Sequence, residues 1–379
     1  MTETVHFAGA DFPLDAESVA SANEPVASLE RLRRFTHLRE LRLVHTDPHS
    51  LPAHSFDDLE PLRALTLLEV LELPDAPVAD LSPLAGLTSL RRLDLARTQV
   101  RDVGPLSALT ALRELDVSGT HVEDLGPLRA LAQLERLAVA QTPVADVAPL
   151  RDLHALRALD VSGTRVQNVA PLRELRELRS FAYRDTPISD LSPLRLRSET
   201  VDLSETAVAV LPDLDGVREL NAAFSAISDL EPLRAARELR RLALDGTALT
   251  DLAPLAGLSE LEVLSLSSTQ VEDLSPLAGL RALHQLNLEG TRVRDVAPLA
   301  GLVSLEELVL ASTPVADISP LAGLSRLRLL QLQHTQVSDL GPLIGLGELF
   351  VVNLRGTPVD DDQVAALQRA HPQLSITRS

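Results

Sequence analysis

The chain lacks cysteine and tryptophan, and aromatic side chains make up only 2% of its 379 residues. Without cysteine there is no disulfide framework, no cysteine zinc site and no thiol nucleophile. No apolar run approaches the roughly 18 residues of a membrane-spanning helix, and the start, MTETVHFAGADF, is unlike a secretory signal. We therefore expect a cytoplasmic chain that does not enter a membrane.

Positive charge is also scarce, and all of it comes from arginine. The chain has 54 acidic and 35 basic residues, no lysine, and a net charge of −19. Because a phosphate backbone is bound by clustered positive charge, we expect no nucleic-acid partner. A GC-rich coding sequence and avoidance of lysine modification would each account for the missing lysine.

What the chain has in abundance is a repeat of 22 residues, marked by a column of threonines. Thr206 and Ser225 mark two shorter coils between two regular runs, and Ala76 and Thr46 extend the column toward the start, which makes fifteen coils. The regular members of the column are Thr98, Thr120, Thr142, Thr164, Thr186, Thr247, Thr269, Thr291, Thr313, Thr335 and Thr357.

Each coil reads approximately L-x-x-L-x-L-x-x-T-x-V-x-D-L-x-P-L. A repeat of this length with this head is the leucine-rich-repeat signature, in which each coil adds one short strand to a parallel sheet. Leu93 and Leu95 are predicted to point inward, and Arg92, Asp94 and Ala96 outward onto a concave face. We predict an α/β repeat solenoid, a leucine-rich-repeat horseshoe with a parallel concave β-sheet and convex turns or 3₁₀ pieces.

An aspartate follows the threonine position by four residues in twelve coils. Stacked carboxylates suggest calcium, but a short acidic side chain before a Pro-Leu turn is better explained as a cap on backbone N–H groups. The threonine hydroxyls are predicted to satisfy backbone groups in the same way, and we expect no metal and no cofactor. The aspartates are Asp80, Asp102, Asp124, Asp146, Asp190, Asp229, Asp251, Asp273, Asp295, Asp317, Asp339 and Asp361.

The coil L-x-x-L-x-L-x-x-T-x-V-x-D-L-S-P-L-A-G-L resembles the 22-residue class of leucine-rich repeats of bacterial internalins and of the regulatory subunit of eukaryotic protein phosphatase 1. The resemblance covers about residues 60–360. It implies the architecture and leaves the partner open. Internalins carry asparagine where this chain has threonine, and the tail from Thr357 is similar to the helical ends of other bacterial repeat proteins.

A solenoid needs caps at both ends, because its terminal coils would otherwise expose core side chains. We assign residues 1–37 to a degenerate first coil and cap, with Val5 and Phe7 on its strand. Residues 38–358 form the solenoid, and residues 359–379 a helical cap over 361–371 with a last strand. Around residues 195–220 the repeat is shortened, which predicts weaker stacking there.

The one histidine cluster is HTDPHSLPAH, with His45, His49 and His54 near Asp47 and Asp57. Such a set can bind zinc, but its spacing matches no short metal motif, and we predict a loop with exposed histidines. The chain has no phosphate loop, no nucleophile elbow and no H-E-x-x-H motif. We therefore predict that the protein is not an enzyme.

The outward strand positions of the N-terminal half form an acid-leaning surface with interspersed arginines. Ordinary solvation of a sheet face and binding of a partner explain it equally well. The acidic positions are Glu72, Asp94, Asp116, Asp160 and Asp202.

The outward positions of the C-terminal half carry less charge. Aliphatic side chains on neighbouring coils form a patch, and such patches usually mark an interface. The predicted partner-binding residues are Val263, Val309, Leu329 and Val351, with Phe350 beside them and Ala311 in a further outward position. Phe224, in the shortest coil, is either a binding anchor or fills a gap left by the missing residues.

These patterns favour a non-catalytic protein–protein interaction module that binds a protein partner on its concave face and is monomeric alone. Two other classes stay open. One is a metal-dependent or acid–base enzyme with a concave-face site, and the other is a structural, self-assembling element.

Overall fold

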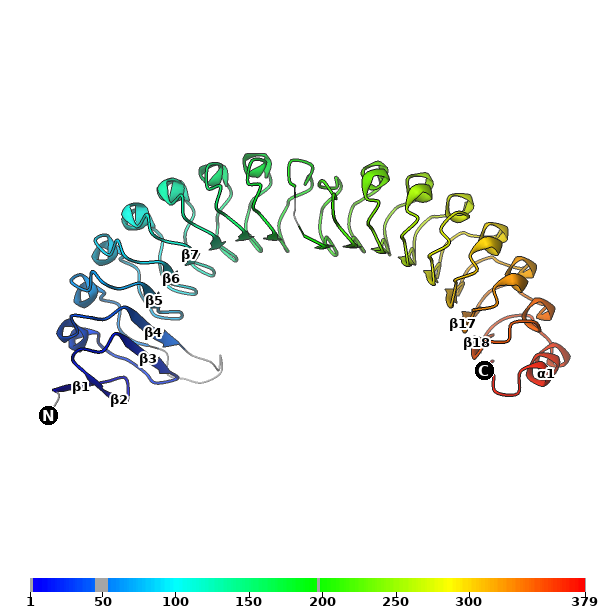
Figure 1. Ribbon diagram of the computed structural model, residues 1–379, viewed down its shortest axis with the longest axis horizontal. Helices are drawn as coiled ribbons and strands as arrows, with labels where there is room; N and C mark the ends of the chain where they lie inside the picture. Colours follow the sequence, from blue (N-terminus) through cyan, green and yellow to red (C-terminus); the bar gives the residue numbers. More distant parts are fainter. Residues whose placement is uncertain (1–2, 45–53, 196–197, 379) are drawn as a thin grey trace. The chain divides into compact units, whose positions relative to one another are not determined.

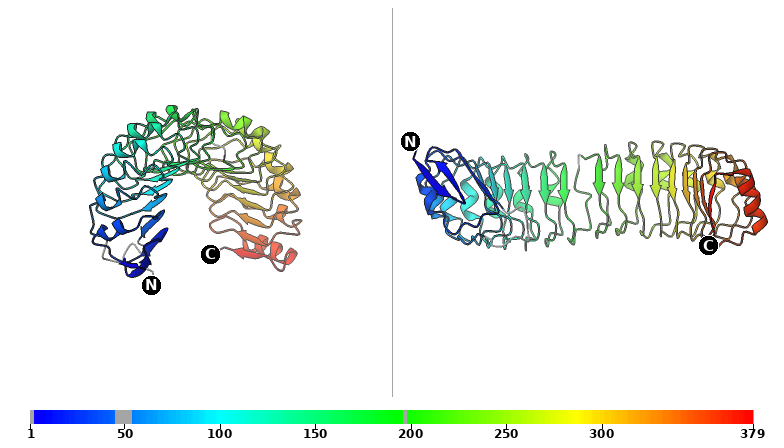
Figure 2. Two further views of the ribbon diagram at one scale, coloured as in Figure 1. Left: turned by 60° about the vertical axis from the view of Figure 1, so that its left-hand side comes forward. Right: turned by 90° about the horizontal axis from the view of Figure 1, so that it is seen from below.

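The structure, a computed structural model, describes residues 3–44, 54–195 and 198–378. The chain divides into two compact units. One comprises Met1–Ile188 with Pro193–Leu196, and the other Ser189–Ser192 with Arg197–Ser379. Within each unit the strands lie side by side along one side of a stack of coils, and the helical turns lie along the opposite side (Figures 1 and 2).

The first unit contains a hairpin and a parallel sheet of eight strands. In the sheet each strand pairs with the strand of the next coil, in the order β10-β9-β8-β7-β6-β5-β4-β3. The strands are β1 (Thr4–Phe7), β2 (Ala10–Pro13), β3 (Ser18–Ala22), β4 (Glu40–Val44), β5 (Val70–Glu72), β6 (Arg92–Asp94), β7 (Glu114–Asp116), β8 (Arg136–Ala138), β9 (Ala158–Asp160) and β10 (Ser180–Ala182).

The second unit contains a parallel sheet of nine strands, in sequence order from β11 to β19. Its strands are β11 (Thr200–Asp202), β12 (Glu219–Asn221), β13 (Arg241–Ala243), β14 (Val263–Ser265), β15 (Gln285–Asn287), β16 (Glu307–Val309), β17 (Leu329–Gln331), β18 (Val351–Asn353) and β19 (Ser375–Thr377). The helix α1 (Asp361–Ala370) lies between the last two strands in the sequence.

Short 3₁₀ turns lie opposite the strands. Most of them have proline in the first turn, where its fixed φ suits the helix and its missing N–H costs no bond. They are η1 (Glu30–Arg34), η2 (Glu60–Leu62), η3 (Ser82–Leu84), η4 (Gly104–Ala108), η5 (Gly126–Ala130), η6 (Ala148–Leu150), η7 (Ala170–Leu172), η8 (Glu231–Ala235), η9 (Ala253–Gly257), η10 (Ser275–Leu277), η11 (Ala297–Gly301), η12 (Ser319–Gly323) and η13 (Gly341–Leu343). Parallel strands and 3₁₀ turns at this spacing confirm the predicted fold class.

The core of each unit is a set of leucine and valine columns that run from coil to coil. Leu93, Leu115 and Leu137 occupy the centres of consecutive paired strands and are at most 2% exposed. The flanking side chains point out, as the two-residue period of a strand requires. From β5 onward each strand has only three residues, so its outer face offers two side-chain positions: the first strand position and the third strand position.

The structure corrects one detail of that alternation. Ala96 and Ala311, predicted to face outward, are 5% and 0% exposed. Both lie beyond the end of the three-residue strand, where the chain already turns away from the sheet. The alternation of a strand therefore does not extend to this position.

The threonine column forms the predicted hydroxyl ladder. In each of its described coils the hydroxyl donates a hydrogen bond to the carbonyl three residues earlier, as from Thr98 to Leu95 at 2.7 Å and from Thr291 to Leu288 at 2.7 Å. Ser225, in the shortest coil, makes the same bond to Ala222. Most of these side chains are buried, and in several coils the hydroxyl adds a second hydrogen bond to a carbonyl that also accepts from the backbone N–H of the same residue, as Leu95 does from Thr98 at 3.3 Å.

The aspartate column acts as the predicted set of caps. Its carboxylates accept a hydrogen bond from the backbone N–H two residues later, as Asp80 does from Ser82 and Asp251 from Ala253, both at 2.8 Å. The hydrogen bond from the Ser82 hydroxyl, followed by this one from the Ser82 N–H, lowers the pKa of Asp80. Asp361 is the exception, because it belongs to α1 and the helix is capped instead by Asp360, which accepts from Gln363.

The N-terminal end differs from the predicted degenerate coil. Val5 and Phe7 are buried as expected, but their strand β1 forms an antiparallel hairpin with β2, closed by Ala8 and Gly9 at positive φ. A two-residue turn of this kind matches the twist of paired strands. The parallel sheet instead begins with β3, which lies later within the residues 1–37 that were assigned to this coil and cap.

The C-terminal end contains a helix and a last strand. The helix predicted over 361–371 is α1, and the last strand is β19, which pairs in parallel with β18. Leu367 of α1 is 0% exposed, and the His371 ring and the Leu343 carbonyl lie within hydrogen-bonding distance at 3.1 Å. The helix thus covers the last coil in place of a further repeat.

The shortened coils are built differently from the others. Among residues 173–195 and 198–230 the structure contains no 3₁₀ turn. Val210, which replaces the capping aspartate, is 43% exposed and forms an isolated parallel bridge with Asp190. β11 also lies at the edge of its sheet, with a paired strand on one side.

We therefore predict that the segment 198–220 has the least stable backbone of the second unit, because the stability of a stack is a sum of coil and interface terms. In hydrogen exchange followed by mass spectrometry, amides of 198–220 should exchange at least about tenfold faster than those of 260–340, a difference of about 1.4 kcal/mol. Equal protection of the two segments would show that the shortened coils are as stable as the regular ones.

Candidate functional site

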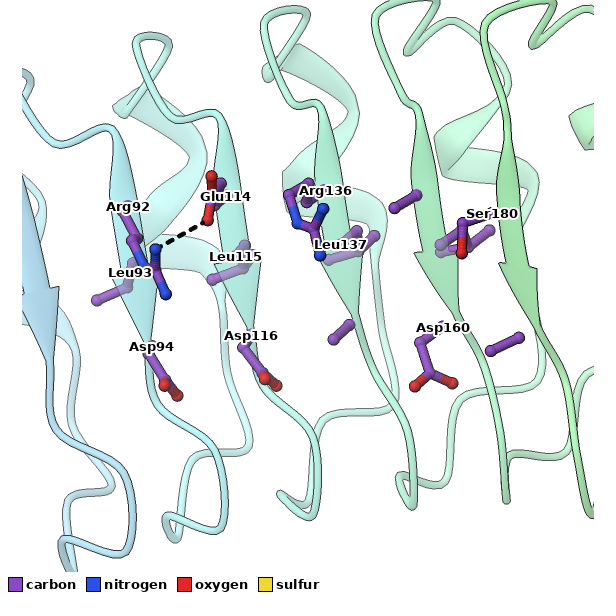
Figure 3. A pocket seen from close by; sticks show the side chains of 14 residues that line it. Arg92, Leu93, Asp94, Glu114, Leu115, Asp116, Arg136, Leu137, Asp160 and Ser180 are labelled. Atoms are coloured by element: carbon purple, nitrogen blue, oxygen red, sulfur yellow. Dashed lines mark ion pairs between the residues drawn. The ribbon is translucent and has the colours of Figure 1, made fainter. Parts of the chain in front are cut away.

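The strand face of the first unit contains a hollow of about 320 Å³, formed by consecutive strands β6 to β10. The first strand positions contribute Arg92, Glu114, Arg136, Ala158 and Ser180, and the third strand positions Asp94, Asp116, Ala138, Asp160 and Ala182. Figure 3 shows the charged side chains projecting from this face. Three of the five predicted acidic residues, Asp94, Asp116 and Asp160, lie here.

These three carboxylates also stabilise the turns that follow their strands. One oxygen of Asp94 accepts from the Ala96 N–H at 2.9 Å, and Asp116 and Asp160 make the same bond two residues on, at 2.8 and 2.9 Å. Burial raises the pKa of Asp94, and the carboxylates of Asp116 and Glu72 raise it further. A cation placed beside this row would relieve that repulsion.

Glu72 does not contribute an accessible acidic group, contrary to the prediction. It is only 7% exposed and is paired with Arg92 at 2.9 Å and Arg42 at 3.5 Å. Arg92 also pairs with Glu114 at 3.4 Å (Figure 3). The strand pattern predicted the direction of Glu72 but could not show the two arginines that cover it.

Asp202 belongs to the other unit. It lies on β11 and accepts from the backbone N–H of Ser204 at 3.0 Å and from the Ser204 hydroxyl at 2.6 Å. The predicted acidic surface is therefore divided between two units, and only Asp94, Asp116 and Asp160 of it line the hollow.

The strand face of the second unit carries part of the predicted apolar patch. Leu329 and Val351 stand opposite each other on β17 and β18, in the first strand position. Val263 is in the same column but is separated from them by Gln285 and Glu307. Val309 occupies a third strand position beside Gln331. All four are partly exposed, but only Leu329 and Val351 are adjacent in register.

Phe350 extends this pair, and we call Leu329, Phe350 and Val351 the apolar strand patch. Phe350 is 59% exposed and directly precedes β18. The equivalent residue two coils earlier is Glu306 and one coil earlier Arg328, whose carbonyl accepts from the Phe350 N–H at 2.9 Å. An aromatic side chain therefore stands where other coils place a charge.

Phe224 neither fills a core gap nor stands free of its neighbours. It is 62% exposed, its φ is +57°, and its ring lies over Gly246 of the next coil, where a Cβ would overlap it. Gly246 has φ of +65° and the lack of a side chain makes room for the ring. Other coils carry Arg97, Gln141 or His334 at this left-handed position, so the conformation belongs to the repeat.

The histidine cluster was predicted to be an exposed loop, and for one of its members this is wrong. His54 is 4% exposed; its Nδ1 accepts from the Val26 N–H at 3.3 Å, and its Nε2 lies 3.2 Å from the Leu43 carbonyl. Its ring also contacts that of Phe56, at 5.4 Å between centroids. His45, Asp47 and His49 lie outside the described residues.

Across residues 3–44, 54–195 and 198–378, no group of three or more histidine, cysteine, aspartate or glutamate residues is placed to hold a metal ion. In the same segments no helix has the length and apolar character needed to cross a membrane.

Comparison with protein families shows what the repeat is. A family model described as "Leucine-rich repeat region" matches residues 53–302. The chain is a leucine-rich repeat protein. This family is generally a non-enzymatic interaction scaffold. No curated protein sequence matches this leucine-rich repeat chain significantly.

Solved leucine-rich repeat structures share the fold. An internalin, InlF of Listeria monocytogenes, is 24% identical, with a TM-score of 0.50 and coverage of 91% of this chain and 89% of the other. A leucine-rich repeat protein of Leptospira interrogans is 18% identical, with a TM-score of 0.55 and coverage of 93% and 81%. A plant peptide hormone receptor, RGFR1 in complex with RGF2, is 15% identical, with a TM-score of 0.61 and coverage of 97% and 68%. The internalin confirms the predicted resemblance.

Proposed function

We propose that this leucine-rich repeat protein is a non-catalytic binding module that holds a protein partner against the strand face of its second unit. The observation that carries the proposal is the apolar strand patch. Leu329 and Val351 are adjacent on paired strands, and Phe350 beside them is 59% exposed.

The patch contributes little to the fold itself. The side chains that stabilise these coils are the inward ones, such as Leu330 and Val352, both 0% exposed. A partner that covers these water-exposed aliphatic and aromatic groups is stabilised by roughly 25 cal/mol per Å² of apolar surface removed from water. Exposed aromatic residues also provide the anchors that dominate many interfaces.

The surroundings of the patch favour a protein over a charged polymer. Gln331 and Asn353 occupy the third strand positions beside Leu329 and Val351. Asn353 accepts from the Arg355 N–H at 3.1 Å, and the amide groups of both residues offer donors and acceptors to a polypeptide. A complex of the receptor RGFR1 with RGF2 on the same fold is consistent with such use of the scaffold.

The test is a double variant, Leu329→Asp with Val351→Asp, against the partner captured from the native organism. Captured proteins are identified by mass spectrometry and their affinity is measured with purified components. We expect affinity to fall more than about tenfold, because two charges would be buried in an apolar contact. The circular dichroism spectrum and melting temperature should change little, since both side chains are outside the core.

A matched control is Ile344→Asp, which places a charge on an equally apolar residue that is 48% exposed at the end of η13. It should leave the affinity unchanged. If the control weakens binding as much as the double variant does, the partner does not use the strand face; if neither does, the apolar strand patch is not the interface.

A further inference from the structure

We infer that the hollow on the first unit is a second docking site, for an extended protein segment that carries an acidic residue and a basic residue two positions apart. This site lies on a different unit from the apolar strand patch and uses ion pairs in place of apolar contact. It stands or falls independently of the proposed function.

The hollow exists because small side chains interrupt two columns of charged ones. In the first strand position, Ala158 and Ser180 follow Arg136. In the third strand position, Ala138 stands between Asp116 and Asp160. The backbone pairing continues through all these strands, so the sheet itself is unbroken. The smaller side chains therefore leave space above the sheet.

The gap at Ala138 has a carboxylate on each side. Adjacent strands are about 4.8 Å apart, so Asp116 and Asp160 on the two strands that flank β8 are separated by about 10 Å at the backbone. Each uses one oxygen in its turn, and in the described part of the chain neither forms an ion pair. A guanidinium or ammonium group above Ala138 would therefore meet two carboxylates at once.

Arg136 supplies the opposite charge on the same strand. Within residues 3–44, 54–195 and 198–378 it has no ion-pair or hydrogen-bond partner, whereas the equivalent Arg92 is paired with both Glu72 and Glu114. Arg136 is exposed and lies two residues before Ala138, about 6.6 Å along β8. The hollow thus has a free cation at one end of β8 and a gap between two carboxylates at the other.

An extended protein segment matches this spacing. Its alternate side chains point to the same side at about 6.6 Å intervals, so that an acidic residue can face Arg136 while the residue two positions along faces Ala138. Arginine suits the second place better than lysine, because its planar group offers donors to both carboxylates. A polyanion such as a nucleic acid would be repelled by the three aspartates of the hollow.

The test is calorimetric titration of the full chain with an end-blocked peptide, Gly-Ser-Glu-Gly-Arg-Ser-Gly. The reference peptide carries glutamine at both charged places. We expect the charged peptide to bind at least about tenfold more tightly than the reference, with the difference lost at high salt. No binding of the charged peptide, or equal binding of the two, would overturn the inference.

The decisive variant is Ala138→Arg, which places the chain's own guanidinium between Asp116 and Asp160 without removing either. This variant should lower the affinity for the charged peptide at least about tenfold. Its melting temperature should be unchanged or higher. The matched control is Ala243→Arg, at the same third strand position of β13, where the neighbours are Asn221 and Ser265. This control should bind the peptide like the unaltered chain.

Two comparisons separate this inference from the proposed function. The variant Leu329→Asp with Val351→Asp should still bind the charged peptide. Arg136→Gln should bind the charged peptide less tightly but should still bind the partner of the apolar strand patch. If Ala138→Arg binds the peptide as tightly as the unaltered chain, the peptide is held elsewhere and the inference is wrong.

Discussion

Replacing Leu286 with alanine is expected to lower the free energy of unfolding of the second unit by about 2–5 kcal/mol, as for other buried leucines. Leu286 is 1% exposed at the centre of β15 and stands between Leu264 and Leu308 on the paired strands. The substitution would leave a cavity between leucine side chains. Water would not fill this cavity, because a buried water molecule needs polar partners. Loss of one side chain therefore weakens the contacts to both neighbouring coils.

Chemical denaturation checks this, together with hydrogen exchange of peptides that cover β14 to β16. The control is Gln285→Ala, one residue earlier on the outer side of the same strand, which should change stability by no more than about 0.5 kcal/mol. If both variants lose a similar free energy of unfolding, the burial of Leu286 does not explain its contribution to stability.

Ending the chain after Val359 is expected to destabilise the last coils by about 3 kcal/mol or more, since burial of Leu367 alone is worth about 1.5–3 kcal/mol. The truncation removes α1 and β19. It also removes the side-chain oxygen of Gln363, which accepts from the Leu340 N–H at 3.2 Å, and uncovers β18. A repeat stack with an uncovered end exposes core leucines, so we also expect aggregation.

Hydrogen exchange over residues 330–359 and light scattering measure the two effects. A second variant, Leu367→Asp, keeps the whole chain and should produce the same loss of protection, because it places a charge in a buried apolar position. Gln373→Ala, at an exposed residue of the same segment, is the control. Unchanged protection in both the truncation and Leu367→Asp would show that the last coil is stable without its helix.

The features predicted correctly from the sequence depend on short-range geometry that every coil repeats. A threonine hydroxyl reaches the carbonyl three residues before it, and an aspartate reaches the N–H two residues after it. Both bonds form within one turn, so the amino-acid sequence of a single coil determines them. The buried leucines follow for the same reason, because the strand period alone decides which side chains point inward.

The errors arose where a residue's surroundings come from another coil or another segment. Two arginines from neighbouring strands bury Glu72, and Val26 and Leu43 provide the partners of His54. At the N-terminus, the strand pattern of Val5 and Phe7 fitted a hairpin as well as a coil, since both have a period of two. The sequence period cannot distinguish the two pairings.

The inward columns and the capping bonds could therefore be predicted from the amino-acid sequence, because each depends on distances within one coil. The 22-residue period and the family resemblance follow from the repeated pattern of residues. The tertiary structure was needed to show how outward side chains combine. It placed Ala138 between two carboxylates, left Arg136 without a partner among the described residues, set Leu329 against Val351 and laid Phe224 over Gly246. These neighbours are about 22 residues apart in the sequence, and only the pairing of strands and the stacking of turns bring them into contact.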